Sequence, residues 1–183
     1  MRLFVAVNFE DSLKDALADT AARLKQEAGS GNFTRRDNFH LTLAFLGEVP
    51  GARISAVKRA MDAVLFEPFS LSFEQLGEFK RSGGGIWWIG AAQYPPLLKM
   101  QADLSAALRR EGFPLESRPF RPHLTLGREV TLPPSFDSNP FRSPFIARHV
   151  RQKKRVNVPD SPWPLEVIRP SGGSLRRAKR ASG

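Results

Sequence analysis

The tetrapeptide His-Leu-Thr-Leu occurs twice in this chain, at residues 40–43 and at residues 123–126. The second copy begins almost half a chain length after the first in a sequence of 183 residues, and the two copies use two of its three histidines. Repetition at this spacing is typical of an internal duplication. It predicts two similar lobes, each of which contributes one motif strand.

Side chains alternate along a β-strand, which gives each motif a polar face and an apolar face. His40 and Thr42 are expected to share one face of the first strand, and His123 and Thr125 one face of the second. The leucines between them occupy the opposite faces, where they can anchor each strand in its lobe. If the lobes meet at a cleft, two imidazoles and two hydroxyls converge in it.

The rest of the sequence predicts a mixed α+β chain. Strands are expected in RLFVAVNF, in Phe39 to Leu46, in a hairpin of FSLSFEQLGEF and IWWIGAA, in FRPHLTLGREV, and in the short segments FIARHV and LEVI. Helices are expected to begin at Asp11 or Ser12, at Pro50-Gly51 and at Pro95-Pro96. GSGN at residues 29–32 predicts a break. The second helix is expected to run to Glu67-Pro68 and to bury one face, made of Ile54, Val57, Met61, Val64 and Leu65.

Composition and charge set wide limits on the function. The chain has no cysteine, which excludes disulfides and thiolate metal sites and suits a reducing compartment. The apolar start from Leu3 to Val7 is too short for a signal-peptide core or a membrane span, so the cytoplasm is expected and a membrane partner is not. Much of the net charge of +10 lies after residue 147, where ten Lys and Arg face only Asp160 and Glu166. A basic tail of this kind can bind nucleic acid through phosphates, but it is more often a solvated end.

Two histidines and two hydroxyls in one cleft suit acid–base cleavage of a phosphoester. A neutral imidazole accepts a proton from the attacking hydroxyl and an imidazolium donates one to the leaving oxygen, because the ordinary pKa of histidine allows both forms near neutral pH. Threonine hydroxyls can donate hydrogen bonds to the non-bridging oxygens. A single motif of this kind would more often be structural, but the duplication favours catalysis.

Metal binding by His40 and His123 is the alternative use of these side chains. Neither histidine is accompanied by a His-x-x-x-His or carboxylate-histidine pattern. No metal and no cofactor are therefore expected.

The segments RLFVAVNF, NFHLTLAFLGEV and RPFRPHLTLGR resemble, in order and spacing, the 2H phosphoesterases, which are named for two His-x-Thr/Ser-x motifs. They are most similar to the branch of bacterial RNA 2′,3′-cyclic phosphodiesterases, also called 2′-5′ RNA ligases. The resemblance covers residues 1 to about 130. It implies a bilobal α+β fold with two pseudo-symmetric lobes, each with an antiparallel sheet and helices, and a central cleft.

The resemblance also implies a reaction and a role for each motif residue. The reaction is metal-independent hydrolysis of a terminal 2′,3′-cyclic phosphate of RNA to a 2′-phosphate, and its reversal gives 2′-5′ ligation. His40 would be the proton donor and His123 the proton acceptor, while Thr42 and Thr125 would hold the phosphate. Nothing in the sequence demands more than a monomer.

Two further residues follow from the resemblance, each five positions after a motif histidine. Arg128 would contact the phosphate, and Phe45 would stack on the terminal base. Strict alternation puts both residues on the leucine side of their strands. Arg128 would then be a solvated arginine and Phe45 an ordinary core phenylalanine, although a bulge at Gly127 could bring Arg128 to the histidine side.

Trp87 and Trp88 are expected to face opposite ways, with neither serving as a base platform. His149, which has no threonine two residues later, is expected to be non-catalytic.

The sequence departs from the family near its end. Residues 1–150 are expected to form one bilobal domain, and residues 151–183 a divergent basic segment whose end is disordered. PLEVI within it is a candidate edge strand.

Two alternatives to the RNA phosphodiesterase stay open: a phosphodiesterase of small cyclic nucleotides, and a non-catalytic module that binds nucleotides or RNA. Intact His and Thr in both motifs argue against the module, because binding alone needs no acid–base pair.

Overall fold

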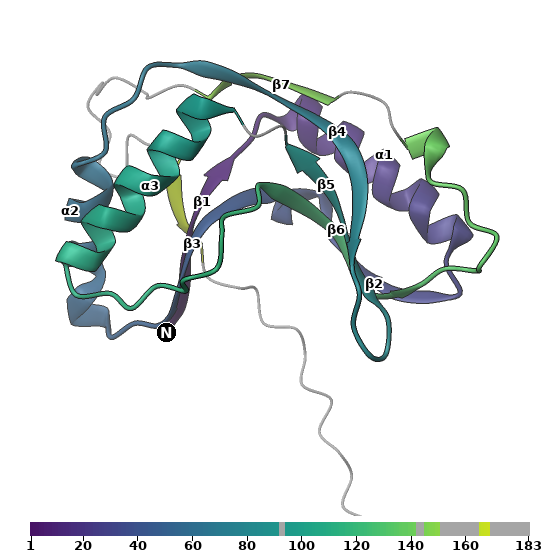
Figure 1. The fold of residues 1–183 in the computed structure, drawn as a ribbon, viewed down its shortest axis with the longest axis horizontal. Helices are drawn as coiled ribbons and strands as arrows, with labels where there is room; N and C mark the ends of the chain where they lie inside the picture. The colour runs from purple at the N-terminus through teal and green to yellow at the C-terminus, as the bar shows by residue number, and fades with distance from the viewer. Residues whose placement is uncertain (92–93, 142–144, 151–164, 169–183) are drawn as a thin grey trace, which may run out of the picture.

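The computed structural model describes residues 1–91, 94–141, 145–150 and 165–168, which form two antiparallel sheets joined in an arch (Figure 1). The first sheet has the order β3-β1-β8, with β1 (Arg2–Asn8), β3 (His40–Glu48) and β8 (Leu165–Ile168). The second has the order β2-β6-β5-β4-β7, with β2 (Ser30–Phe33), β4 (Phe69–Phe79), β5 (Gly85–Ala91), β6 (His123–Thr131) and β7 (Phe145–Val150). Each sheet contains one motif strand, as the predicted two-lobed α+β fold requires.

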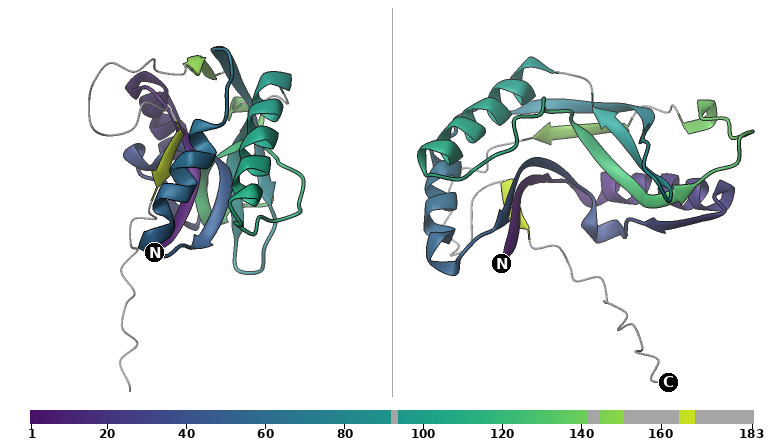
Figure 2. Two further views of the ribbon diagram at one scale, coloured as in Figure 1. Left: turned by 90° about the vertical axis from the view of Figure 1, so that its left-hand side faces the viewer. Right: turned by 60° about the horizontal axis from the view of Figure 1, so that its bottom comes forward.

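Two of the helices pack on the sheet opposite to the one that contains the strand before them in the chain. Helix α1 (Asp11–Glu27) follows β1 of the first sheet, yet it packs against β2, β6 and β7 of the second. Helix α3 (Pro95–Arg110) leads into β6 but packs against β3, and α2 (Ile54–Asp62) packs against α3. Figures 1 and 2 accordingly show α2 and α3 at one end of the arch and α1 at the other. The two halves of the chain are therefore interleaved.

Short 3-10 turns lie at Arg36–Asn38, Gly51–Arg53 and Asn139–Phe141.

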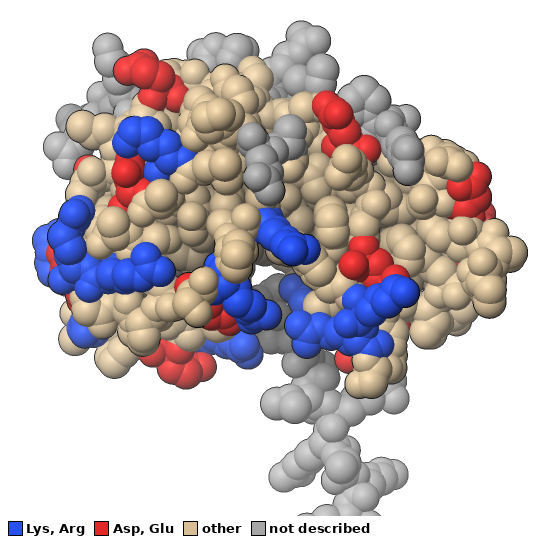
Figure 3. Space-filling view, in the orientation of Figure 1, with Lys and Arg blue, Asp and Glu red and all other residues tan. Residues whose placement is uncertain are grey.

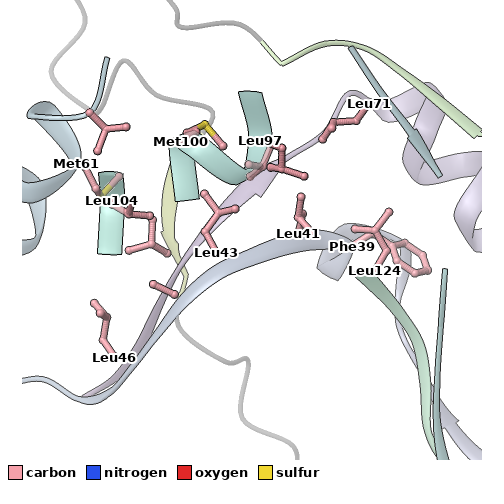
Figure 4. Packing of buried hydrophobic residues seen from close by; sticks show 14 of the residues in the cluster. Phe39, Leu41, Leu43, Leu46, Met61, Leu71, Leu97, Met100, Leu104 and Leu124 are labelled. Atoms are coloured by element: carbon pink, nitrogen blue, oxygen red, sulfur yellow. The ribbon is translucent and has the colours of Figure 1, made fainter. Parts of the chain in front are cut away.

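One apolar core receives the leucine faces of both motif strands. The four motif leucines are all buried in the same cluster: Leu41, Leu43, Leu124 and Leu126. On β3 the leucines point toward Leu97, Met100 and Leu104 of α3 (Figure 4). These α3 residues recur at helical spacing after a proline in the first turn, so one stripe of the helix is apolar and lies on the sheet.

Three details expected from the sequence are wrong. Residues 29–32 are not a simple break, because Ser30–Phe33 forms β2 and obtains its hydrogen bonds from β6, far away in the sequence. The second helix ends at Asp62, several residues before Glu67. Leu65, expected on the buried face of that helix, is 75% exposed, because the chain turns outward after the buried Val64.

The two short strands expected near the C-terminus are confirmed. Residues 145–150 form β7 beside β4, and residues 165–168 form β8 at the edge of the first sheet, where Ile168 lies opposite Phe4. The division into a domain at 1–150 and a divergent extension stays a prediction, since residues 151–164 and 169–183 lie outside the described part. None of the helices in the described part is long and apolar enough to cross a membrane.

The burial of Leu41 gives a direct test of this core. Leu41 is fully buried, so replacing it with alanine should lower the free energy of unfolding by about 2–5 kcal/mol, through lost apolar contact and the cavity that remains. Urea unfolding followed by circular dichroism measures the change. Leu65→Ala is the matched control, with an expected effect of less than about 0.5 kcal/mol because Leu65 is exposed. Equal losses in the two variants would contradict the packing described for β3.

Candidate active site

The two motif strands meet where the sheets join. β3 and β6 pack against each other but belong to different sheets. His40 and Thr42 are half-buried while the leucines between and after them are buried, and His123 and Thr125 repeat the pattern, which confirms the expected alternation. Because both leucine faces enter one core, both histidine-threonine faces are turned away from it. In Figure 3, Lys and Arg side chains, with some Asp and Glu among them, lie around a hollow in the middle of the molecule.

Each motif strand carries a β-bulge three residues after its histidine. The pairing of β3 with β1 skips Leu43, and the pairing of β6 with β5 skips Leu126. One extra residue reverses the alternation of the side chains that follow it. The residues five positions after each histidine, Phe45 and Arg128, therefore reach the histidine face.

The exposure of both residues agrees with this reversal. Phe45 is 39% exposed and Arg128 is also exposed, so placement by strict alternation is wrong for both, and Phe45 is not an ordinary core phenylalanine. The bulge considered at Gly127 lies next to it, at Leu126. The carbonyl of each bulged leucine accepts a hydrogen bond from another element: Gln101 Nε2 donates to Leu43 at 3.2 Å, and the backbone N–H of Thr34 donates to Leu126 at 2.8 Å.

A second irregularity directly follows Arg128. Glu129 has a φ of 55°, in the left-handed region that side chains other than glycine rarely adopt. The backbone of Gly84, in the turn between β4 and β5, packs so closely on it that a Cβ there would lie 2.5 Å from the Glu129 carbonyl carbon. From β2, Asn32 Nδ2 donates to Glu129 Oε2 at 2.7 Å. Contacts from β2 and from the turn before β5 thus hold the segment that carries Arg128.

His123 is positioned by its own loop and by two aromatic rings. Its Nδ1 lies 2.6 Å from the carbonyl oxygen of Arg121, and because a carbonyl only accepts, this bond assigns the proton to Nδ1 and leaves Nε2 as an acceptor. The ring of Phe79 meets the imidazole edge-on at 5.2 Å, and Trp88 lies at 6.0 Å. Burial lowers the pKa of His123, the bond to Arg121 partly opposes this, and the charge of Arg128 lowers the pKa further.

His40 is held differently. The ring of Phe4, on the neighbouring strand β1, stacks on the imidazole with the centroids 4.7 Å apart. The 3-10 turn before His40 is tied to α1, because Arg36 forms ion pairs with Asp11 and Asp15 at the start of that helix. Phe4 has no polar group that would mark it in a sequence, so sequence reasoning missed it.

Trp87 and Trp88 face opposite ways, as expected, although both are half-buried. Trp87 packs against Phe136, whereas Trp88 lies on the His123 face beside Phe79. The indole of Trp88 lies flat over glycine backbone, since a Cβ at Gly77 would come within 2.3 Å of it. A glycine opposite a tryptophan was the available signal for this wall of the site.

Side chains that could hold a metal do not gather in the described residues. No group of three or more His, Cys, Asp or Glu side chains within 1–91 and 94–141 is suited to a metal ion. His149 lies on β7, whose side chains are outside the described part.

The chain belongs to the 2′-5′ RNA ligase superfamily, whose family model matches residues 13–154. It is 33% identical to an RNA 2′,3′-cyclic phosphodiesterase of Archaeoglobus fulgidus over 129 residues, which cover 70% of this chain and 72% of the relative. It is also 33% identical to the Escherichia coli protein of the same name, over 73% of this chain and 77% of that one. The family expected from the two motifs is thus confirmed.

Solved structures show the same fold. The crystal structure of E. coli LigT with 3′-AMP superimposes with a TM-score of 0.65 and 30% identity, over 74% of this chain and 77% of LigT. The structure of TT0787 of Thermus thermophilus gives a TM-score of 0.63 and 25% identity, over 80% of each chain. The arch of two sheets is therefore the fold of the family.

The surroundings of His123 lead to a prediction about its titration. Because burial disfavours the imidazolium, the pKa of His123 should lie below about 6.5, and the side chain should be neutral at pH 7. Trp88→Ala exposes the ring and should move this pKa up toward the ordinary value. NMR titration of the histidine ring protons measures it. Trp87→Ala is the control, since that indole faces the other way; an equal change in both variants, or none in Trp88→Ala, would contradict the description.

Proposed function

We propose that this protein is an RNA 2′,3′-cyclic phosphodiesterase that hydrolyses a terminal 2′,3′-cyclic phosphate to a 2′-phosphate without a metal. The observation that carries the proposal is that the two motif strands contact each other and both turn their histidine-threonine faces away from one core, with Arg128 turned to the histidine face of its strand by a bulge. The names of the relatives from A. fulgidus and E. coli support the substrate.

In the proposed mechanism His123 is the general base and His40 the general acid. Nε2 of neutral His123 accepts a proton from a water molecule, whose oxygen attacks phosphorus. The bond from phosphorus to the 3′-oxygen breaks, and protonated His40 donates a proton to that oxygen, which leaves a 2′-phosphate and a 3′-hydroxyl. The lowered pKa of His123 and its bond to Arg121 favour the base role for this histidine.

Three side chains are proposed to hold the phosphate. Thr42 and Thr125 donate hydrogen bonds to the non-bridging oxygens, where negative charge accumulates in the transition state. Arg128 supplies a guanidinium whose paired donors fit a phosphate. Phe45 is proposed to stack on the terminal base. The same attack with an RNA 5′-hydroxyl in place of water breaks the same bond to the 3′-oxygen and gives a 2′-5′ bond.

Hydrolysis of a short RNA that ends in a 2′,3′-cyclic phosphate, measured with EDTA present, tests the proposal. His40→Ala and His123→Ala should each lower kcat by about 10²–10⁴, the usual contribution of one positioned acid or base. The phosphate position in the product, read by ³¹P NMR, should be 2′. Full activity in either variant, or loss of wild-type activity in EDTA, would contradict the mechanism.

The same experiment separates the alternatives. A wild type that hydrolyses cyclic mononucleotides but not RNA would be a phosphodiesterase of small cyclic nucleotides. A folded wild type that binds RNA ends and never turns them over would be a binding module. We also propose that the enzyme acts in the cytoplasm as a monomer, for which light scattering should give the mass of one chain.

A further inference from the structure

Arg2 lies on the face of β1 that also carries Phe4, the residue that stacks on the candidate catalytic residue His40. Residues 3, 5 and 7 of β1 are buried in the core, so Arg2 and Phe4 belong to the opposite face of the strand. Phe4 stacks on His40 and lies opposite Phe45 in the register of β1 and β3. On this face Phe4 contacts His40, Phe45 lies opposite Phe4, and Arg2 lies beyond Phe4 along β1.

The guanidinium of Arg2 contacts the ring of Phe45. Its Cζ lies 5.0 Å from the centre of the exposed Phe45 ring, a cation–π contact that fixes the side chain beside the surface proposed to take the terminal base. Glu48, the residue opposite Arg2 in the register, is paired with the amino group of Met1 at 2.8 Å. Within the described residues Arg2 forms no ion pair, so its charge is available to an anion.

We infer that Arg2 binds the phosphodiester that joins the terminal nucleotide to the preceding one, and that the site consequently prefers RNA chains to cyclic mononucleotides. The inference rests on the proposed function. RNA carries one negative charge per nucleotide, so once the cyclic phosphate is at His40 and His123 and the base is on Phe45, the next anionic group is that phosphodiester. A guanidinium already held on a ring loses little side-chain freedom when its paired donors meet a phosphate.

The test compares three substrates with wild type and Arg2→Met, which keeps an apolar side chain over Phe45 but removes the charge. The substrates are a 2′,3′-cyclic mononucleotide, a dinucleotide with the same cyclic end, and that dinucleotide with a neutral methylphosphonate linkage. Wild type should lose roughly tenfold in kcat/KM when the linkage is neutralised, about the effect of one charge-assisted hydrogen bond. Arg2→Met should lose the same factor on the natural dinucleotide and nothing on the other two. Arg2→Lys should recover part of it.

Arg109→Met is the matched control. Arg109 is an exposed arginine at the end of α3, which packs on the opposite, leucine face of β3, so its replacement should leave all three rates unchanged. An Arg2→Met protein that loses activity equally on every substrate would show a structural role, and one that loses none would show that Arg2 binds no phosphate; either result overturns the inference. If wild type turned over none of the substrates, the proposed function itself would fail.

Discussion

The structure depends on one shared apolar core, into which both motif strands turn their leucines. Leu41 and Leu43 come from one sheet and Leu124 and Leu126 from the other, and all four lie in the same cluster. Since side chains alternate along a strand, burying these leucines also decides where the histidines and threonines point. The packing that stabilises the protein is therefore the packing that aims its polar groups.

The exchange of helices strengthens this arrangement. α1 follows β1 of the first sheet but packs on the second, and α3, which lies between β5 and β6 of the second sheet in the chain, packs on the first. Separation of the first half of the chain from the second would expose the apolar faces of these helices together with the leucine faces of the motif strands. A site assembled between interleaved halves is held more rigidly than one between two lobes joined by a linker, and rigidity suits acid–base chemistry that depends on short distances.

Much of this site follows from the sequence alone, and its limits have a physical cause. The motif faces around His40 and His123 follow from local alternation, which needs no knowledge of the neighbours. The positions of Phe45 and Arg128 depend on bulges, which arise from the register with β1 and β5 and from contacts such as the one between Gly84 and Glu129. β2 likewise exists only because β6 lies beside it. Effects that one strand imposes on another are not visible in a short window of sequence.

A crystal structure with a bound nucleoside 2′-monophosphate, the proposed product, tests the central claim most directly. That claim is that two strands from different sheets aim their polar groups at one phosphate. The account predicts that Nε2 of His40 and Nε2 of His123 both lie within about 2.6–3.2 Å of phosphate oxygens on different sides of the phosphorus, with Thr42 and Thr125 on the remaining oxygens. A phosphate bound elsewhere, or one that contacts a single motif while the other faces away, would contradict it.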